Sequence, residues 1–236
     1  MSERHRQKRI AALSYILALP RSIWYNCKLL PFSQARKLPL LISHRTVVNS
    51  LSGKVEIHAS HLRMGIVKIG FNTYQGSNLR HDRTIVNVRG KMVFNGECSL
   101  GLGSAIEVAE EAVLTFGNHA CLGPKSLVIC HKEVTFGDYC RVAWRCTFMD
   151  SDQHDLVNEN KQITNQDKPI RMGDKVWVGC NVIATKGVHI ASNNTVAAGA
   201  VLHGSYDECE TVIAGNPAKA VKCGVVRNFD RIANRD

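Results

Sequence analysis

The sequence predicts an all-β fold, a parallel β-helix of six-residue coil segments, preceded by a helical arm. From residue 172 to residue 202 an aliphatic or small residue recurs at every sixth position: Met172, Val178, Ala184, Ile190, Val196 and Leu202. The fifth position of each hexad is small or β-branched in four of five cases: Val176, Val182, Val188, Asn194 and Ala200. A period of six fits neither a helix nor a single strand, whereas three hexads of one strand each close a triangular coil.

The same register appears earlier in the chain, although less regularly. It passes through these positions: Val88, Phe94, Leu100, Ile106, Phe116, Leu122, Phe136, Val142 and Phe148. Cys98, Cys140 and Cys146 fall on the fifth position, so we expect them to be small core residues. A narrow prism leaves little room for rings, which agrees with an aromatic content of only 6%.

The chain divides into three parts. Residues 1–45 do not repeat and are expected to form a basic helical cap, with one helix over 9–25 broken at Pro20 and a second over 33–37. Residues 46–220 form the β-helix, and the polar stretch 149–169 interrupts its register as an extruded loop. Long loops on a regular scaffold usually carry function. Residues 221–236 form a tail, with a closing helix expected over 221–232.

Composition narrows the function classes. With 236 residues, 44% hydrophobic and 21% charged, the chain is neither disordered nor a disulfide-stapled scaffold. Of the net charge of +10, most lies in residues 1–45, which hold nine Lys and Arg against one acidic residue. Such an arm is either a solvated face or a contact for anionic lipid or acidic polymer. No zinc finger, Walker loop or aromatic-basic stripe accompanies it, so no nucleic-acid partner is expected.

Nine cysteines without a CxxC pair indicate free thiols in a reducing compartment. The apolar run 10–19 is too short to span a bilayer, and no cleavage site follows it. We therefore expect a cytoplasmic protein, with the inner face of the membrane as the surface that the arm would contact.

Three motifs carry a family resemblance: Val176–Gly179, Ala197–Val201 and Ala214–Lys219. Over residues 172–222 they resemble the hexapeptide-repeat acyltransferases, and residues 136–154 look like the sugar O-acetyltransferases of capsule, O-antigen and exopolysaccharide synthesis. The resemblance covers roughly residues 30–225. It implies a left-handed β-helix, acetyl-CoA as co-substrate without a metal, a saccharide acceptor, and a homotrimer with active sites between subunits.

Acetyl transfer to a hydroxyl needs a base, and His154 is the strongest candidate among ten histidines. It lies in the polar loop, where the family also places its catalytic histidine, and acidic residues flank it. Asp152 is our candidate for orienting its ring, with Asp150 as an acceptor contact; residue reasoning alone leaves open which aspartate orients it.

Further roles follow from the resemblance. The backbone N–H of Cys180 matches an oxyanion donor, with the Cys180 thiolate as a covalent nucleophile the alternative. Trp177 matches an acceptor-site wall, or packs against a neighbouring subunit. The positions expected to contact CoA are Gly179, Ala198, Gly199, His203, Lys219 and Lys222.

The resulting prediction is an O-acetyltransferase that moves an acetyl group from acetyl-CoA to a saccharide hydroxyl by direct attack, with His154 as general base. Other acceptors remain open (an amino sugar, an antibiotic or a small alcohol), because residues 123–125 and 130–131 depart from the acceptor positions of relatives. A non-catalytic scaffold is a further alternative. A zinc carbonic anhydrase is disfavoured, since its His-x4-His pair is missing near His154.

Overall fold

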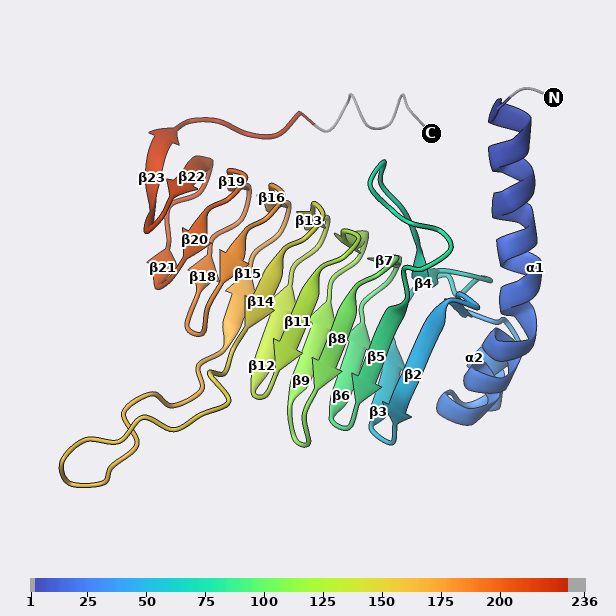
Figure 1. Ribbon diagram of the computed structural model, residues 1–236, viewed down its shortest axis with the longest axis horizontal. Coiled ribbons are helices and arrows are strands. Elements are labelled where there is room, and N and C mark those ends of the chain that lie inside the picture. Colours follow the sequence, from blue (N-terminus) through green and yellow to red (C-terminus); the bar gives the residue numbers. More distant parts are fainter. Residues whose placement is uncertain (1–2, 229–236) are drawn as a thin grey trace.

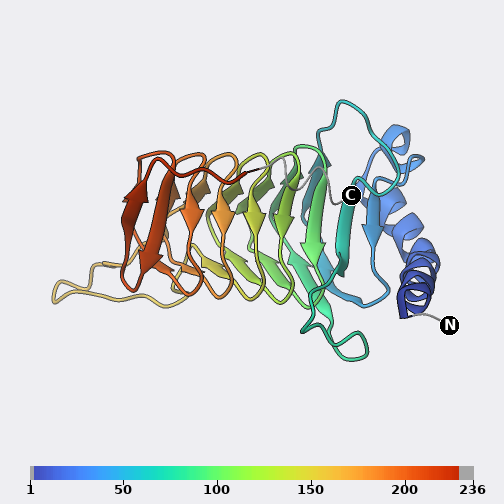
Figure 2. The same ribbon diagram turned by 90° about the horizontal axis from the view of Figure 1, so that it is seen from above.

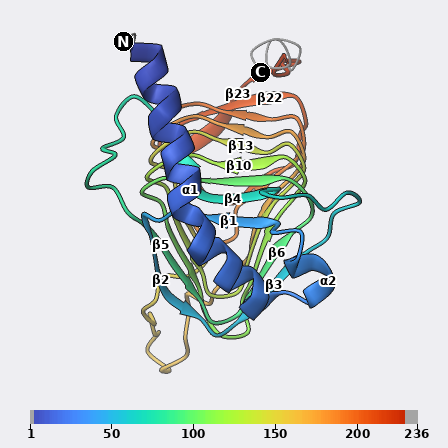
Figure 3. The ribbon, with the colours of Figure 1, turned by 90° about the vertical axis from the view of Figure 1, so that its right-hand side faces the viewer.

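Three parallel sheets form the three faces of a long prism, and each coil contributes one strand to each face (Figures 1 and 3). The computed structural model describes residues 3–228, with side chains from residue 13 onward. We call the three faces sheets A, B and C. Chain order runs from A to B to C and back to A, so successive coils stack along the prism axis.

Sheet A contains, in spatial order, β1 (Leu40–Ile42), β4 (Val67–Asn72), β7 (Cys98–Gly101), β10 (Ala120–Leu122), β13 (Arg141–Val142), β16 (Trp177–Val178), β19 (Thr195–Val196), β22 (Thr211–Gly215) and β23 (Ala218–Cys223). Sheet B contains β2 (Thr46–Leu51), β5 (Thr84–Val88), β8 (Ala105–Val108), β11 (Leu127–Cys130), β14 (Thr147–Met149), β17 (Ile183–Ala184) and β20 (Val201–Leu202). Sheet C contains β3 (Lys54–Ile57), β6 (Lys91–Phe94), β9 (Val113–Phe116), β12 (Glu133–Phe136), β15 (Ile170–Met172), β18 (His189–Ile190) and β21 (Ser205–Tyr206).

The hexad positions occupy the core, as the sequence predicts. In sheet A, Val142 lies opposite Val178, and Val178 opposite Val196, in parallel register. All three are buried, and so are Cys140 and Cys146 at the fifth position. Every cysteine is a free thiol. The six-residue period therefore reports directly which side chains point inward.

The expectation that rings are excluded from the prism is wrong. Phe94, Phe116 and Phe136 occupy equivalent positions on neighbouring strands of sheet C, with ring centroids 5.6 and 5.1 Å apart. Phe148 on sheet B meets Phe136 edge-on at 4.9 Å. Neighbouring parallel strands lie about 4.8 Å apart, so rings in register stack at nearly the coil spacing and fit inside.

A long helix, α1 (Glu3–Leu29), closes the first coil, and a short helix, α2 (Phe32–Ala35), follows it. Asn26 binds both backbone groups of Leu40 on β1, with Nδ2 donating at 2.8 Å and Oδ1 accepting at 3.1 Å. The Ser22 hydroxyl accepts the Ile42 N–H at 2.9 Å. Polar side chains of α1 thus satisfy the open edge of sheet A.

Two boundaries of the arm differ from the prediction. The helix does not break at Pro20 but continues to Leu29; both Pro20 and Ile16, whose carbonyl loses its helical partner, belong to the exposed side of the helix. The β-helix begins at Leu40 rather than at residue 46, since β1 already pairs with β4.

The outward side of α1 is apolar, with exposed Leu13, Ile16, Leu17, Ile23 and Trp24. Among the described residues, no helix is long and apolar enough to cross a membrane. Contact between this arm and a membrane surface stays a prediction.

The C-terminal end is closed by a hairpin rather than by the expected tail helix. β23 runs antiparallel to β22, so residues 221–223 are strand, and residues 224–228 contain no helix. The rest of the expected helix lies outside the described residues. Once β22 has completed the last coil, its free edge is best covered by a further strand, which the adjacent residues supply.

Candidate active site

The loop that carries His154 leaves the prism between β14 and β15, at the edge where sheets B and C meet. Figure 3 shows it projecting from the vertex opposite sheet A, and Figure 1 shows its length. His154 is exposed, and its ring makes no hydrogen bond to the described residues. The side chain is therefore available to a ligand.

A polar clamp fixes the base of this loop. Asp152 accepts from Lys186 Nζ at 2.5 Å and from Asn165 Nδ2 at 2.8 Å. The same Asn165 amide donates to the backbone oxygen of His154 at 2.7 Å. These hydrogen bonds, first that of Lys186 and then that of Asn165, lower the pKa of Asp152. The clamp is therefore complete above the ordinary carboxyl pKa and is lost as pH falls through the lowered value.

Asp150 has a different position from the one expected. It is fully buried, and its carboxylate accepts the backbone N–H groups of His131 at 2.7 Å, Lys132 at 2.8 Å and Glu133 at 2.7 Å. Both oxygens are thus occupied by the turn between β11 and β12. Asp150 anchors the start of the loop to the preceding coil and does not face an acceptor.

Asp150→Ala is expected to lower the free energy of unfolding by about 3 kcal/mol or more, because three amides lose their partner where water cannot replace it. Urea denaturation of the variant measures this loss. Asp155→Ala, a change at an exposed position of the same loop, is the matched control. Equal stabilities of the two variants would contradict the anchoring role.

The Cys180 turn lies on another edge, where sheet A passes into sheet B. The Gly199 N–H donates to the Cys180 carbonyl at 2.9 Å, so the two turns stack directly. A Cβ on Gly179 would come within 2.6 Å of the Ala198 nitrogen, which explains the glycine. The Cys180 N–H donates to no group within residues 3–228. This edge offers exposed small-residue backbone and one open amide.

Trp177 lies on the outer face of sheet A, 43% exposed, beside Arg141 of the neighbouring strand. The Arg227 guanidinium lies 5.7 Å from the centre of its ring, because the C-terminal tail returns along this face (Figure 2). Burial, and then the charge of Arg141, lower the pKa of Arg227. Trp177, Arg141 and Arg227 thus form one surface on sheet A. The sequence motifs predicted Trp177 as part of the site but neither arginine.

The remaining candidates lie toward the C-terminal end. His203 and Lys219 line one open hollow of about 490 Å³, next to the β22–β23 hairpin. Lys222 is exposed on β23, opposite Val212. The described residues contain no group of three or more His, Cys, Asp or Glu that could hold a metal ion.

The structure therefore groups the predicted residues into separate sets. Gly179, Cys180, Ala198 and Gly199 share one edge, and Trp177 lies on the adjoining face. The His154 loop projects from the other edge of sheet B, so one chain alone does not bring His154 to Cys180. Sequence reasoning missed Lys186 and Asn165, whose contacts with Asp152 span 34 and 13 residues and follow no repeat.

A three-sided β-helix with stacked small-residue corners and an extruded loop between β14 and β15 defines the class of protein. The chain has the β-helix fold of the solved acetyltransferase structure described below, and its hexad motifs resemble those of the hexapeptide-repeat acyltransferases. No family model matches the sequence.

Three relatives make the comparison specific. An uncharacterized 24.8 kDa protein of the cps region of Klebsiella pneumoniae is 26% identical over 137 residues, 58% of this chain and 60% of that protein. The Escherichia coli protein WbbJ, provisionally named a lipopolysaccharide biosynthesis O-acetyl transferase, is 25% identical over 143 residues, 56% of this chain and 72% of WbbJ. The crystal structure of the polySia specific acetyltransferase NeuO has the same fold, with a TM-score of 0.54 and 21% identity over 81% of this chain and 87% of NeuO. The match to the Klebsiella pneumoniae protein thus spans less than two thirds of that protein's length.

Proposed function

We propose that this protein transfers an acetyl group from acetyl-CoA to a hydroxyl of a saccharide acceptor. The observation that carries the proposal is the exposed His154, whose ring has no hydrogen-bond partner among the described residues, on a clamped loop that begins within one coil of the Cys180 turn. The names of WbbJ and NeuO, which refer to acetyl transfer and to lipopolysaccharide or polysialic acid, support this choice of donor and acceptor.

The complete site is proposed to form between subunits of a homotrimer. The His154 loop leaves the prism between β14 and β15, and Trp177 lies on β16, the first strand of the next coil, so the base of the loop and Trp177 lie at neighbouring levels of the prism. Rotation about an axis parallel to the prism keeps these levels side by side in neighbouring subunits. The loop of one subunit then lies opposite Trp177 and Cys180 of its neighbour.

An apolar row on the outer face of sheet B supports association. Successive Cα partners along the prism are Val47, Ile85, Ala105, Leu127, Thr147, Ile183 and Val201. Only one of the seven is polar, and Val47, Ile85 and Ile183 are 39–43% exposed. Contiguous apolar rows of this kind usually mark contact surfaces.

The proposed reaction needs no covalent enzyme intermediate. The acceptor oxygen attacks the thioester carbonyl carbon while the His154 ring takes the hydroxyl proton. The Cys180 N–H stabilises the resulting oxyanion. Collapse breaks the C–S bond, and the imidazolium returns its proton to the CoA thiolate, so the products are an acetyl ester and CoA. Small residues at Ala198 and Gly199 leave room for the pantetheine arm beside this edge.

Release of the free CoA thiol tests the proposal. The purified chain is incubated with acetyl-CoA and a panel of neutral oligosaccharides, acidic oligosaccharides and amino sugars. We expect acceptor-dependent thiol release with a hydroxyl acceptor. Turnover only with amines would support the amino-sugar alternative, and absence of acetyl-CoA binding would support the non-catalytic scaffold.

Cys180→Ser is expected to keep activity within about threefold of the native level, because a backbone N–H is unaffected by the side chain. Initial rates at saturating acetyl-CoA measure the effect. If the thiolate were a covalent nucleophile, the variant would lose activity by orders of magnitude and the native protein would accumulate an acetyl-enzyme, detectable by mass spectrometry.

A further inference from the structure

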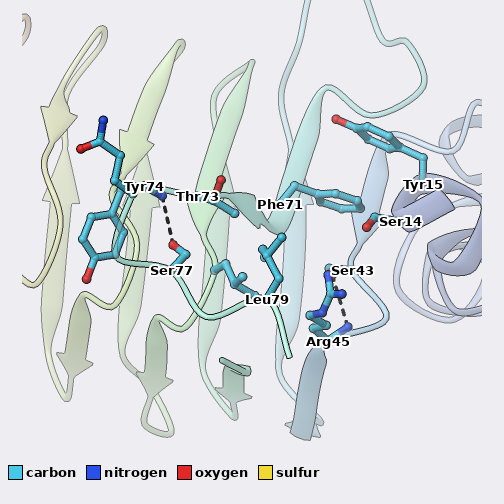
Figure 4. Close-up of a pocket in the computed structure, with 12 residues that line it drawn as sticks. Ser14, Tyr15, Ser43, Arg45, Phe71, Thr73, Tyr74, Ser77 and Leu79 are labelled. Atoms are coloured by element: carbon cyan, nitrogen blue, oxygen red, sulfur yellow. Dashed lines mark hydrogen bonds between the residues drawn. The ribbon is translucent and has the colours of Figure 1, made fainter. Parts of the chain in front are cut away.

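A cavity of about 600 Å³ lies at the N-terminal end of the prism, far along the axis from the His154 loop. Its walls come from α1, the turn between β1 and β2, the strand β4, the loop 73–83 between β4 and β5, and Leu102 after β7 (Figure 4). The volume is within the range of small-molecule sites. None of the residues proposed for transfer lines it.

The lining combines aromatic surface with hydroxyl groups. Tyr15 of α1 stacks on Phe71 of β4, with ring centroids 4.8 Å apart and planes at 13°. Ser43, Thr73 and Ser77 also belong to the lining and carry hydroxyl groups. Aromatic faces beside hydroxyl donors and acceptors suit a sugar ring, which has apolar C–H faces and a polar rim.

The cavity is also positively charged. Arg45 lines it, and Arg21 and Arg83 lie nearby. Burial, followed by the charges of these three arginines, lowers the pKa of His44. Burial, and then the charge of Arg83, lower the pKa of Arg45 itself. Arg21 donates a hydrogen bond to the Thr46 carbonyl, and Arg83 donates to the carbonyls of Arg80 and Asp82. Within residues 13–228 the arginines that pair with a carboxylate are Arg63, Arg89 and Arg171, so Arg21, Arg45 and Arg83 have no such partner. Crowded cations without an anion favour a negatively charged ligand.

The loop 73–83 connects this cavity to the proposed transfer edge. Tyr74 stacks on Trp144 with ring centroids 5.4 Å apart. The Trp144 carbonyl in turn accepts the Asn181 N–H at 3.1 Å, in the turn that contains Cys180. The half-buried Tyr74 and the exposed Trp144 therefore continue an aromatic contact from the cavity along the edge between sheets A and B.

We propose that the cavity binds an acidic sugar unit, with Arg45 pairing with its carboxylate and the Tyr15–Phe71 pair contacting its ring. This sugar unit belongs to the same polysaccharide whose hydroxyl is acetylated further along the edge between sheets A and B. That assignment rests on the proposed function. The cavity thus selects anionic polysaccharides and holds them at a distance from the reacting hydroxyl.

Isothermal titration calorimetry with three probes tests the site: tetragalacturonate, its fully methyl-esterified form and inorganic phosphate. The ester keeps the sugar and removes the charge, whereas phosphate keeps a charge without a sugar. We expect tetragalacturonate to bind at least tenfold more tightly than either. Arg45→Gln should weaken its binding at least tenfold, a loss of about 1.4 kcal/mol. Arg63→Gln, which removes an exposed arginine paired with Glu97, should change binding less than twofold.

Tyr15→Ala provides a second variant should Arg45→Gln fail to fold, and it should weaken tetragalacturonate and the ester alike. Equal binding of acid and ester, equal binding of phosphate, or no effect of either variant would overturn the acidic-sugar site. His154→Ala should bind tetragalacturonate like the native protein. If transfer fails but this binding holds, the cavity stands without the transferase.

Discussion

His154→Ala is expected to lower the rate of acetyl transfer by about 10²–10⁴-fold, the range that loss of a positioned general base produces. The loss should fall on turnover, because the imidazole takes a proton only as the hydroxyl attacks. Acetyl-CoA binding should be unchanged, since the donor candidates lie on other coils. The exposed ring has no partner among the described residues, so the melting temperature should not change either.

His61→Ala is the matched control, because it removes an exposed imidazole distant from the loop. Its activity should equal that of the native chain. A His154→Ala protein that keeps more than a tenth of the native rate would exclude His154 as the base.

Co-expression of His154→Ala chains with Trp177→Ala chains is expected to restore activity that each variant lacks alone. In a cyclic trimer with the loop of one subunit against the face of the next, random mixing pairs an intact His154 with an intact Trp177 in about one quarter of the sites. Differently tagged chains allow mixed trimers to be isolated before the rates are measured.

A mixture of His154→Ala and His154→Gln chains should stay inactive, which controls for recovery unrelated to complementation. If the site were built within one chain, no mixture would regain activity. An active monomer would contradict the shared site in the same way.

The hexad register was sufficient to predict the fold, since it specifies which side chain points inward at each step. Val142, Val178 and Val196 are buried as the period requires. The register did not reveal that Phe94, Phe116 and Phe136 would stack, because that depends on the alignment of neighbouring coils. The sequence does not reveal this alignment, because successive coils in this region have different numbers of residues between equivalent positions.

The site was less accessible to prediction than the fold. The polar composition of the loop identified the position of His154, but not the Lys186 contact that fixes its base. Asp150 resembled a site residue because it is acidic and close to His154 in sequence. Its burial depends on three amides of the previous coil, which a repeat pattern does not show. Extruded loops do not follow the six-residue repeat, so the repeat does not predict which residues they contact.

Transfer of a labelled acetyl group tests the central claim most directly. The protein is incubated with ¹³C-acetyl-CoA and an acidic oligosaccharide, and the product is analysed by NMR. We predict a ¹³C-acetyl ester on a sugar hydroxyl, formed by the native chain and absent with His154→Ala. Label found in an amide, or remaining entirely on CoA and in free acetate, would contradict a saccharide O-acetyltransferase.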